Sequence, residues 1–270
     1  MKYRKALFLL VYSRTKKGFE YLILKRKLHW KGWEFPKGGV EDSERDNMKT
    51  IKRELKEETG LKPLWVKDFK ISGKYKYEKE LSDRMGYIGQ TYHLYAIKVK
   101  KEKPSIDTKE HSKAEWVNYK TAMDRLTWDD QKKCLKKVNE WLKKMKFREM
   151  ELDSGKIVLM GRNDNENEKL MQEFMGEDKL VMHTVESGSP FCVALTKPSK
   201  ISKKDKKQMA ILCSAYSQDW RKHKQDVKVH VFSGKDVYKK SKMKKGTFGV
   251  KKPEIIVAKK QDIKKVRKIK

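Results

Sequence analysis

Cysteine and proline are scarce in this chain, and it has no long apolar run. Three cysteines and six prolines occur among 270 residues, and Cys134, Cys192 and Cys213 form no CxxC pair. Neither a disulfide framework nor a zinc site is therefore indicated, and a reducing, cytoplasmic environment is expected. The apolar run at 6–12 is too short to cross a membrane and lacks a cleavage site, so we expect a buried strand there and no membrane partner.

Acidic residues are outnumbered by basic ones. The chain has 68 Lys and Arg against 37 Asp and Glu, which gives a formal net charge of +31. Self-repulsion of this size is usually tolerated where a polyanion is the partner, and nucleic acid is the first candidate. A thermophile-like surface rich in Lys and Glu is the alternative, although such a surface would tend to balance the two signs.

The N-terminal half alternates strand-like and helix-like segments. Residues 6–12 and 21–25 are β-branched or aromatic runs separated by a polar segment, which predicts a hairpin. Ser43 is a candidate N-cap for a helix that runs to about Thr59, where Gly60 is placed to stop it. Further strands follow, and then a helix with an apolar stripe made of Cys134, Leu135, Val138, Trp141, Leu142 and Met145. This order predicts an α+β domain in which helices sandwich a sheet.

The pattern restarts near Phe147 with a strand-like MELDSGKIVLMGR and a polar stretch that can begin a helix. After residue 200, Lys and Arg strongly outnumber the acidic residues, and the chain ends in KKVRKIK. We therefore predict a first domain at 1–147, a second, smaller α+β domain at 148–260, and a basic tail at 261–270.

Three glutamates crowd one face of the first predicted helix. Within RELKEE, Glu54, Glu57 and Glu58 occupy positions i, i+3 and i+4. Like charges this close repel each other, and a bound cation would relieve the repulsion. Exposed helices also carry glutamate clusters, so the residues alone leave metal binding and a solvated face as open alternatives.

The context of this helix carries a family resemblance. The string from Gly39 to Leu61, which reads G-x13-RELxEExGL, resembles the Nudix box. The resemblance implies an α-β-α sandwich and a pyrophosphohydrolase, with an inactive Nudix-like scaffold as the alternative. One position departs from the motif, because Arg45 stands where the family has a glutamate. Glu44 lies one residue earlier, and a shortened loop would let it take that role.

The resemblance also implies roles for individual residues. Glu57 and Glu58 would ligate Mg²⁺ or Mn²⁺ together with the Gly39 carbonyl, while Glu54 would be a further ligand or polarise the attacking water. Arg53 would orient the carboxylates. Hard divalent cations prefer oxygen ligands and lower the pKa of a bound water, which agrees with this set.

Two further segments bear on the substrate. HWKGWEFPKGG and KEHSKAEWV are similar to Nudix members that cleave diadenosine tetraphosphate and related dinucleotides, and WEFPKGG also resembles RNA 5′-end pyrophosphohydrolases. The first of these resemblances implies that Glu110 contributes to metal binding or base catalysis. We expect phosphate contacts from Arg26, His29 and Lys37. The nearby aromatic residues either stack on a base or pack in the core, and these are Trp30, Trp33 and Tyr77.

The second half resembles the NFACT-R domain over about 148–260, on residues Gly161, Arg162, Asn163, Asn167, Asp178, His183, Lys245 and Gly246. Leu180, Val181 and Met182 stand where an aromatic pair usually precedes the histidine. The resemblance implies an RNA-contacting module, with tRNA, rRNA or an mRNA 5′ end as partner. Lysine clusters with interleaved aromatics support it, and the candidate contacts are Arg162, Lys222, Lys224, Lys244 and Lys245. His183 is expected to be structural.

These features leave three functional hypotheses. The first is an Mg²⁺-dependent pyrophosphohydrolase that cleaves a dinucleoside polyphosphate or related nucleotide and carries an RNA-binding domain. The second keeps this chemistry on an RNA 5′ end. The third is a non-catalytic RNA- or ribosome-associated factor that uses the Nudix fold as a binding platform.

Overall fold

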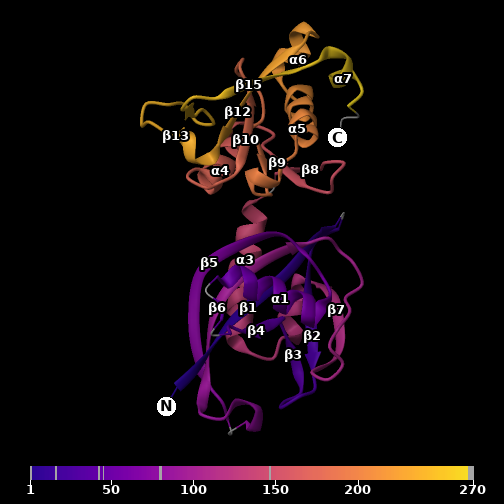
Figure 1. Ribbon diagram of the computed structural model, residues 1–270, viewed down its shortest axis with the longest axis vertical. Helices are drawn as coiled ribbons and strands as arrows, with labels where there is room; N and C mark the ends of the chain where they lie inside the picture. The colour runs from indigo at the N-terminus through magenta and orange to yellow at the C-terminus, as the bar shows by residue number, and fades with distance from the viewer. Residues whose placement is uncertain are drawn as a thin grey trace. The chain divides into compact units, whose positions relative to one another are not determined.

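The computed structural model describes residues 2–15, 17–41, 43–44, 46–78, 81–145 and 147–266. The chain divides into two compact units, Met1–Lys143 and Lys144–Lys270, which are considered separately (Figure 1). Each unit combines helices with a sheet, so the predicted α+β class is confirmed for both. Among the helices of the described residues, none is long and apolar enough to cross a membrane.

The first unit is built on a seven-stranded mixed sheet with the order β3-β2-β1-β6-β5, in which β4 also pairs with β1 and β7 with β2. β1 runs parallel to β6, and the other pairs are antiparallel. The strands are β1 Lys2–Thr15, β2 Gly18–Arg26, β3 Gly32–Glu34, β4 Lys37–Gly39, β5 Pro63–Lys76, β6 Tyr87–Val99 and β7 His111–Asn118. The predicted hairpin is the β1–β2 pair.

Helices cover both faces of this sheet. Because side chains alternate along a strand, Leu7 and Leu9 of β1 pack on one face against α1 (Asn47–Thr59), while Phe8 and Leu10 pack on the other face against α3 (Asp129–Lys144). The contact on α3 is the predicted apolar stripe, including Cys134, Leu135, Val138 and Leu142. A short α2 (Tyr119–Arg125) and the 3-10 turn η1 (Ser82–Arg84) complete the unit. The result is the predicted α-β-α sandwich.

The start of α1 differs from the prediction. Asp46, and not Ser43, is the N-cap, because its carboxylate accepts a hydrogen bond from the Met48 amide at 2.9 Å. Gly60 ends the helix as expected, since its φ of 71° is the left-handed conformation that glycine adopts most readily.

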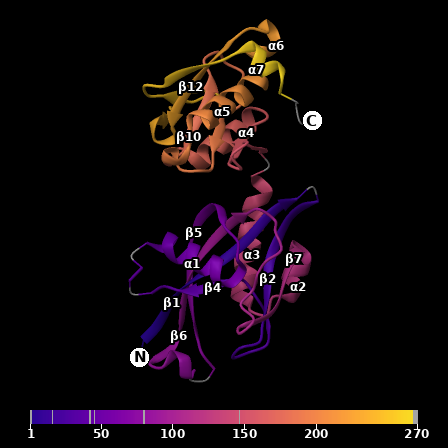
Figure 2. The same ribbon diagram turned by 45° about the vertical axis from the view of Figure 1, so that its right-hand side comes forward.

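The second unit contains a six-stranded antiparallel sheet with the order β15-β12-β10-β11-β9-β8. These strands are β8 Arg148–Glu151, β9 Ile157–Met160, β10 Leu180–Thr184, β11 Cys192–Ala194, β12 Val227–Ser233 and β15 Glu254–Ala258, with a separate pair of β13 Val237–Tyr238 and β14 Gly249–Val250. The helices are α4 Asp164–Phe174, α5 Lys203–Ala215, α6 Gln218–His223 and α7 Lys260–Lys264, with two 3-10 turns at Pro198–Lys200 and Gly234–Asp236. Figure 2 shows this unit, coloured toward yellow, from a second direction.

The predicted basic tail begins too early. Ile263 of α7 is only 2% exposed and belongs to the core of the second unit, and Val266 packs against the same core. Residues 261–266 are therefore part of the folded unit, because their apolar side chains have a surface to bury against. The rest of the predicted tail, 267–270, lies outside the described residues.

Candidate active site

The carboxylate face of α1 lies at the margin of the first core. Ile51 and Leu55 point into that core and hold the helix on the sheet. On the neighbouring side of the helix, Glu54 and Glu58 are 9% and 7% exposed, whereas the side chain of Glu57 is 58% exposed. All three line a cavity of about 210 Å³, together with Arg4, Arg26, Lys37, Gly38, Gly39, Arg84, Gln90 and Glu110. The helix period thus brings the predicted carboxylates to one cavity.

One guanidinium joins this helix to β4. Arg53 donates to Glu54 at 2.7 Å, to Glu57 at 3.1 Å and to the carbonyl oxygen of Gly39 at 2.9 Å. β4 and α1 lie close together, because a Cβ on Gly38 would lie 1.9 Å from the carboxyl carbon of Glu54. A side chain at position 38 would therefore displace the carboxylate.

Glu44 also binds this guanidinium. Its two carboxylate oxygens accept from Arg53 at 3.0 and 2.9 Å, and one of them accepts from the Thr50 hydroxyl at 2.7 Å. The hydrogen bonds from Arg53 and Thr50 hold the pKa of Glu44 at about 2, so it is an anion at neutral pH. Glu44 thus supports Arg53 from the loop, whereas Arg45 lies outside the described residues.

Burial raises the pKa of two carboxyls in this cavity, Glu54 and Glu58. Burial raises the pKa of Glu58 well above its usual value, and the charges of Glu34, Glu54 and Glu110 add to the effect. Burial also raises the pKa of Glu54, despite the nearby Arg53. A carboxyl with a raised pKa resists losing its proton, and a nearby cation stabilises its ionised form.

The donor set fits a divalent metal ion. Among the described residues, Glu58, Glu110 and His111 each present a ligand atom, and these atoms all lie within 4.8 Å of one another. Carboxylate oxygens are the ligands that hard divalent cations prefer. The Nδ1 atom of His111 is buried and has no hydrogen-bond partner in the protein.

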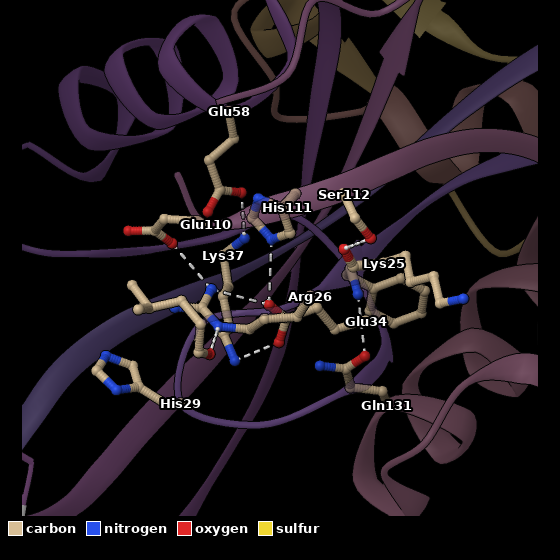
Figure 3. A network of polar contacts seen from close by, with 12 residues as sticks. Lys25, Arg26, His29, Glu34, Lys37, Glu58, Glu110, His111, Ser112 and Gln131 are labelled. Atoms are coloured by element: carbon tan, nitrogen blue, oxygen red, sulfur yellow. Dashed lines mark hydrogen bonds and ion pairs between the residues drawn. The ribbon is translucent and has the colours of Figure 1, made fainter. Parts of the chain in front are cut away.

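A buried ionic network centred on Glu34 adjoins the cavity, and this network was not predicted from the sequence (Figure 3). Glu34 is fully buried, and it forms ion pairs with Arg26 at 3.0 Å, with His111 at 3.3 Å and with Lys37. Burial alone would raise the pKa of Glu34, but Lys37, His111 and Arg26 outweigh it and lower the pKa to about 2. Arg26 also pairs with Glu110 at 2.9 Å. The only signal in the sequence is an acidic residue between Trp33 and Phe35.

A larger, aromatic cavity of about 460 Å³ adjoins the carboxylate cavity. Trp30 and Trp128 meet edge to face at 5.1 Å, and the Arg84 guanidinium lies 5.5 Å from the ring centre of Tyr77. The lining also includes Phe8, His29, Tyr75, Lys76, Glu78, Leu81, Thr127, Asp129, Asp130 and Gln131, and three residues line both cavities, namely Arg26, Lys37 and Arg84. Neither Arg84 nor Trp128 was predicted from the sequence.

The predicted substrate residues occupy different places. Trp30 and Tyr77 line the aromatic cavity, as do Arg26, Lys37 and His29. His29 adopts a φ of 69° and pairs with Asp83 at 3.2 Å. Trp33 does not line this cavity and packs against the hydrophobic core, which is the alternative stated for it.

In the second unit the predicted RNA contacts form two groups. Arg162 precedes α4 and pairs with Glu166 at 2.6 Å, and the segment of Lys244 and Lys245 lies against the start of the same helix, where the Gly246 amide donates to Glu168. A second group, Lys222 and Lys224, lies at α6, with the Lys224 ammonium 5.1 Å from the Trp220 ring centre. Figure 1 shows β13, which precedes the segment of Lys244 and Lys245, apart from α6.

His183 has structural contacts. Its Nδ1 lies 2.7 Å from the Thr184 carbonyl oxygen, and its ring packs on Phe191 with a centroid distance of 4.5 Å. Burial lowers the pKa of His183, so the neutral ring is favoured.

Comparisons with known proteins match both units. The model of the NUDIX domain matches residues 2–138, and the model of the NFACT protein RNA binding domain matches residues 144–252. An RNA pyrophosphohydrolase of a Nitratiruptor species is 32% identical over 137 residues, which is 49% of this chain and 87% of that protein.

Several solved structures are similar to part of this chain. A NUDIX hydrolase of Listeria monocytogenes is 23% identical, with 53% of this chain and 95% of that chain covered and a TM-score of 0.42. An Ap4A hydrolase of C. elegans is 19% identical, with 52% and 98% covered and a TM-score of 0.44. The C-terminal part of a fibronectin/fibrinogen-binding protein of Streptococcus suis is 21% identical, with 44% and 48% covered and a TM-score of 0.39.

Proposed function

Because the chain belongs to the Nudix family of hydrolases and also carries an NFACT-R RNA-binding domain, we propose that it cleaves a pyrophosphate bond at the 5′ end of an RNA. The observation that carries the proposal is the pair of adjoining cavities, one lined by carboxylates and one by aromatic rings, with Arg26, Lys37 and Arg84 shared between them. In a 5′-terminal nucleotide, one ribose joins the base to the 5′ phosphate chain. The base would therefore lie in the aromatic cavity while the phosphates reach the carboxylate cavity.

The carboxylate cavity is proposed to hold the metal ion. Glu54, Glu57, Glu58 and Glu110, with the carbonyl of Gly39, supply the oxygen ligands, and Mg²⁺ or Mn²⁺ suits them. When bound, such an ion neutralises a diphosphate and lowers the pKa of a coordinated water. Arg53 holds Glu54 and Glu57 in place through its hydrogen bonds.

The aromatic cavity is proposed to hold the first base. Its volume of about 460 Å³ falls within the range of roughly 300–1,000 Å³ typical of small-molecule sites. Trp30, Trp128 and Tyr77 offer ring faces and edges, and base stacking on aromatic side chains contributes about 1–3 kcal/mol per base. Lys37, Arg26 and Arg84 place positive charge where the phosphates would pass, with His29 at the rim.

The second unit is proposed to bind the body of the RNA. Its candidate contacts are Arg162, Lys244 and Lys245 beside α4 and, separately, Lys222 and Lys224 at α6. Phosphate contacts by such residues recruit RNA without reading its sequence. Such contacts suit tRNA, rRNA or mRNA alike, because all three present phosphates.

A dinucleoside polyphosphate is the second candidate substrate. The aromatic cavity accepts one nucleoside of such a molecule as readily as the 5′ nucleoside of RNA, and the segment that holds Glu110 resembles that of enzymes with this activity. RNA is preferred because a free dinucleotide leaves the RNA-binding domain of the same chain without a role.

Hydrolysis of a 5′-triphosphorylated RNA and of diadenosine tetraphosphate, measured side by side with Mg²⁺, tests the proposal. We expect a higher kcat/KM on the RNA and loss of turnover in Glu58→Gln, with the exposed Glu140→Gln as the matched control. Faster cleavage of the dinucleotide would favour the second candidate. No cleavage of either substrate would favour a binding factor.

A further inference from the structure

Glu34 is a buried carboxylate that touches three segments around the two cavities. Arg26 ends β2, Lys37 begins β4 and His111 begins β7, and Glu34 forms an ion pair with each of them. We infer that Glu34 is a positioning residue, which sets the geometry of Glu58 and Glu110 through these three contacts. This inference rests on the proposed function, because it concerns the same site.

The first path runs through Arg26. One terminal nitrogen of its guanidinium is 3.0 Å from Glu34 and 2.9 Å from Glu110, and its Nε donates to the Leu28 carbonyl oxygen at 3.1 Å. A guanidinium is planar and rigid, so these three acceptors fix its orientation. The side chain of Glu110 is 37% exposed. Its place beside the cavity therefore depends on the Arg26 guanidinium, which Glu34 in turn holds.

The second path runs through Lys37. Its ammonium pairs with Glu34, and its backbone amide donates to a carboxylate oxygen of Glu58 at 2.9 Å. The same residue thus ties the buried carboxylate to a proposed metal ligand on α1. A shift of Lys37 would change the hydrogen bond that orients Glu58.

The third path runs through His111, which follows Glu110 directly. Its Nε2 lies 3.3 Å from Glu34, and this contact leaves Nδ1 as the unpartnered atom. Figure 3 shows the imidazole between Glu34 on one side and Glu58 on the other. Of the three clustered residues, His111 therefore contacts Glu34 directly. Glu110 is linked to Glu34 through Arg26, and Glu58 is linked to it through Lys37.

Glu34 differs from Glu115, another bridging carboxylate of this unit, in that two of its partners line the cavities. Two of its partners, Arg26 and Lys37, line both cavities. By contrast, Glu115 also joins two cations in the same unit, Lys113 and Arg125, but none of these three residues lines either cavity. Glu115→Gln is therefore a matched control, since it removes a bridging carboxylate without touching the site.

The test measures Mn²⁺ binding to the full-length protein, from the electron paramagnetic resonance signal of the free ion, alongside kcat/KM and thermal unfolding. Loss of the groups that orient metal ligands typically costs about 10- to 100-fold in metal affinity or activity. We expect Glu34→Gln to lose affinity in this range, Glu34→Asp to lie between it and wild type, and Glu115→Gln to bind Mn²⁺ as wild type does.

A double-mutant cycle tests the path through Arg26. If Glu34 acts through this residue, the losses in Mn²⁺ affinity from Glu34→Gln and Arg26→Gln do not multiply in the double variant. Equal Mn²⁺ affinity in Glu34→Gln and Glu115→Gln, or losses that multiply, would overturn the inference. Should Glu34→Gln fail to fold, Arg26→Lys replaces it, because its single nitrogen keeps the charge but lacks the second donor that binds the Leu28 carbonyl oxygen and fixes the orientation of the side chain; wild-type Mn²⁺ affinity in Arg26→Lys would likewise overturn the inference.

The two readouts keep this inference apart from the proposed function. Mn²⁺ affinity does not depend on which substrate is cleaved, so wild-type protein that cleaves neither RNA nor dinucleotide would remove the proposed function alone. The role of Glu34 would still be decided by the affinity of its variants for the ion.

Discussion

Replacing Arg53 by lysine separates the charge at this position from its geometry. Arg53 donates to three carboxylates, Glu44, Glu54 and Glu57, and to the Gly39 carbonyl, all at 2.7 to 3.1 Å. Lysine keeps the positive charge, but its three donors share one nitrogen and cannot span these acceptors. We expect Arg53→Lys to fold and to hold Glu54, Glu57 and the Gly39 carbonyl of β4 less firmly.

The contacts set the size of the effect. A hydrogen bond to a charged group contributes about 1.5–3 kcal/mol, and the guanidinium is 25% exposed, so the lower end applies. Losing one or two such bonds lowers the free energy of unfolding by about 1.5–3 kcal/mol, which is a fall in Tm of about 3–12 °C for a domain of this size. Loosened metal ligands lower kcat/KM by about 10- to 100-fold.

The assay is a titration of activity with Mg²⁺. Because the ligands are displaced and not removed, Arg53→Lys should need more Mg²⁺ for half-maximal rate, and high Mg²⁺ should restore part of the activity. Arg14→Lys, in the exposed part of β1, is the control. An unchanged Mg²⁺ requirement together with an unchanged kcat/KM would refute the argument that Arg53 orients the ligands.

Three further predictions concern the buried carboxyl of Glu58, the hydrogen bonds of Asp205 and two lysines of the second unit. In EDTA, Glu58→Gln should be more stable than wild type, and increasingly so from pH 5 to pH 8, because a carboxyl with a raised pKa in the folded state loses its stabilising contribution as pH rises through that pKa; equal unfolding curves at both pH values would contradict this. Asp205 accepts from Ser154, Lys156 and Ser202, which lower its pKa, so Asp205→Asn should cost about 2–3 kcal/mol at neutral pH. That cost should shrink as pH falls below 4, because the carboxyl is then protonated in the unfolded chain while its lowered pKa keeps it ionised in the folded protein, and denaturant melts at pH 7 and pH 3 check it. Finally, Lys244→Ala with Lys245→Ala should weaken RNA binding and flatten its salt dependence by up to about one unit of slope for each phosphate that is no longer bound, and an unchanged slope would place the RNA elsewhere.

The sequence is most informative where the structure is local. The glutamates at 54, 57 and 58 share one face because of the helix period, and Gly60 ends the helix through its own backbone conformation. Both features depend on residues within a few positions of one another. Ser43 is a reasonable N-cap from the sequence because serine and aspartate both cap helices well, and only the path of the chain selects Asp46.

Glu34 could not be found in this way because its partners are distant in sequence. The network needs β2 to pair with both β3 and β7, in a register that sets Arg26 against Gly32 and His111. No periodicity within WEFPKGG reveals such a register. A fully buried acidic residue is rare unless it is paired, so its burial was the missing fact.

The end of the chain shows a related difficulty. Charge composition favours a tail from residue 261, since lysine dominates the last segment. Ile263 nevertheless buries against the second core, together with residues such as Trp220 and Ala258. One apolar side chain with a surface to cover outweighs several lysines that remain in solvent, and that surface is formed by segments that composition does not connect.

The chain as a whole is strongly basic, whereas the carboxylate cavity combines both signs of charge. The net charge of +31 favours binding of a polyanion, while the cavity is lined by Glu54, Glu57, Glu58 and Glu110 as well as by Arg4, Arg26, Lys37 and Arg84. In the proposed function, the four glutamates would repel a polyphosphate until a divalent cation neutralises them. Basic residues such as Lys244 and Lys245 need no such ion. Under the proposed function, metal would therefore control cleavage while the lysines control affinity, so RNA would remain bound to a chain that is not cleaving it.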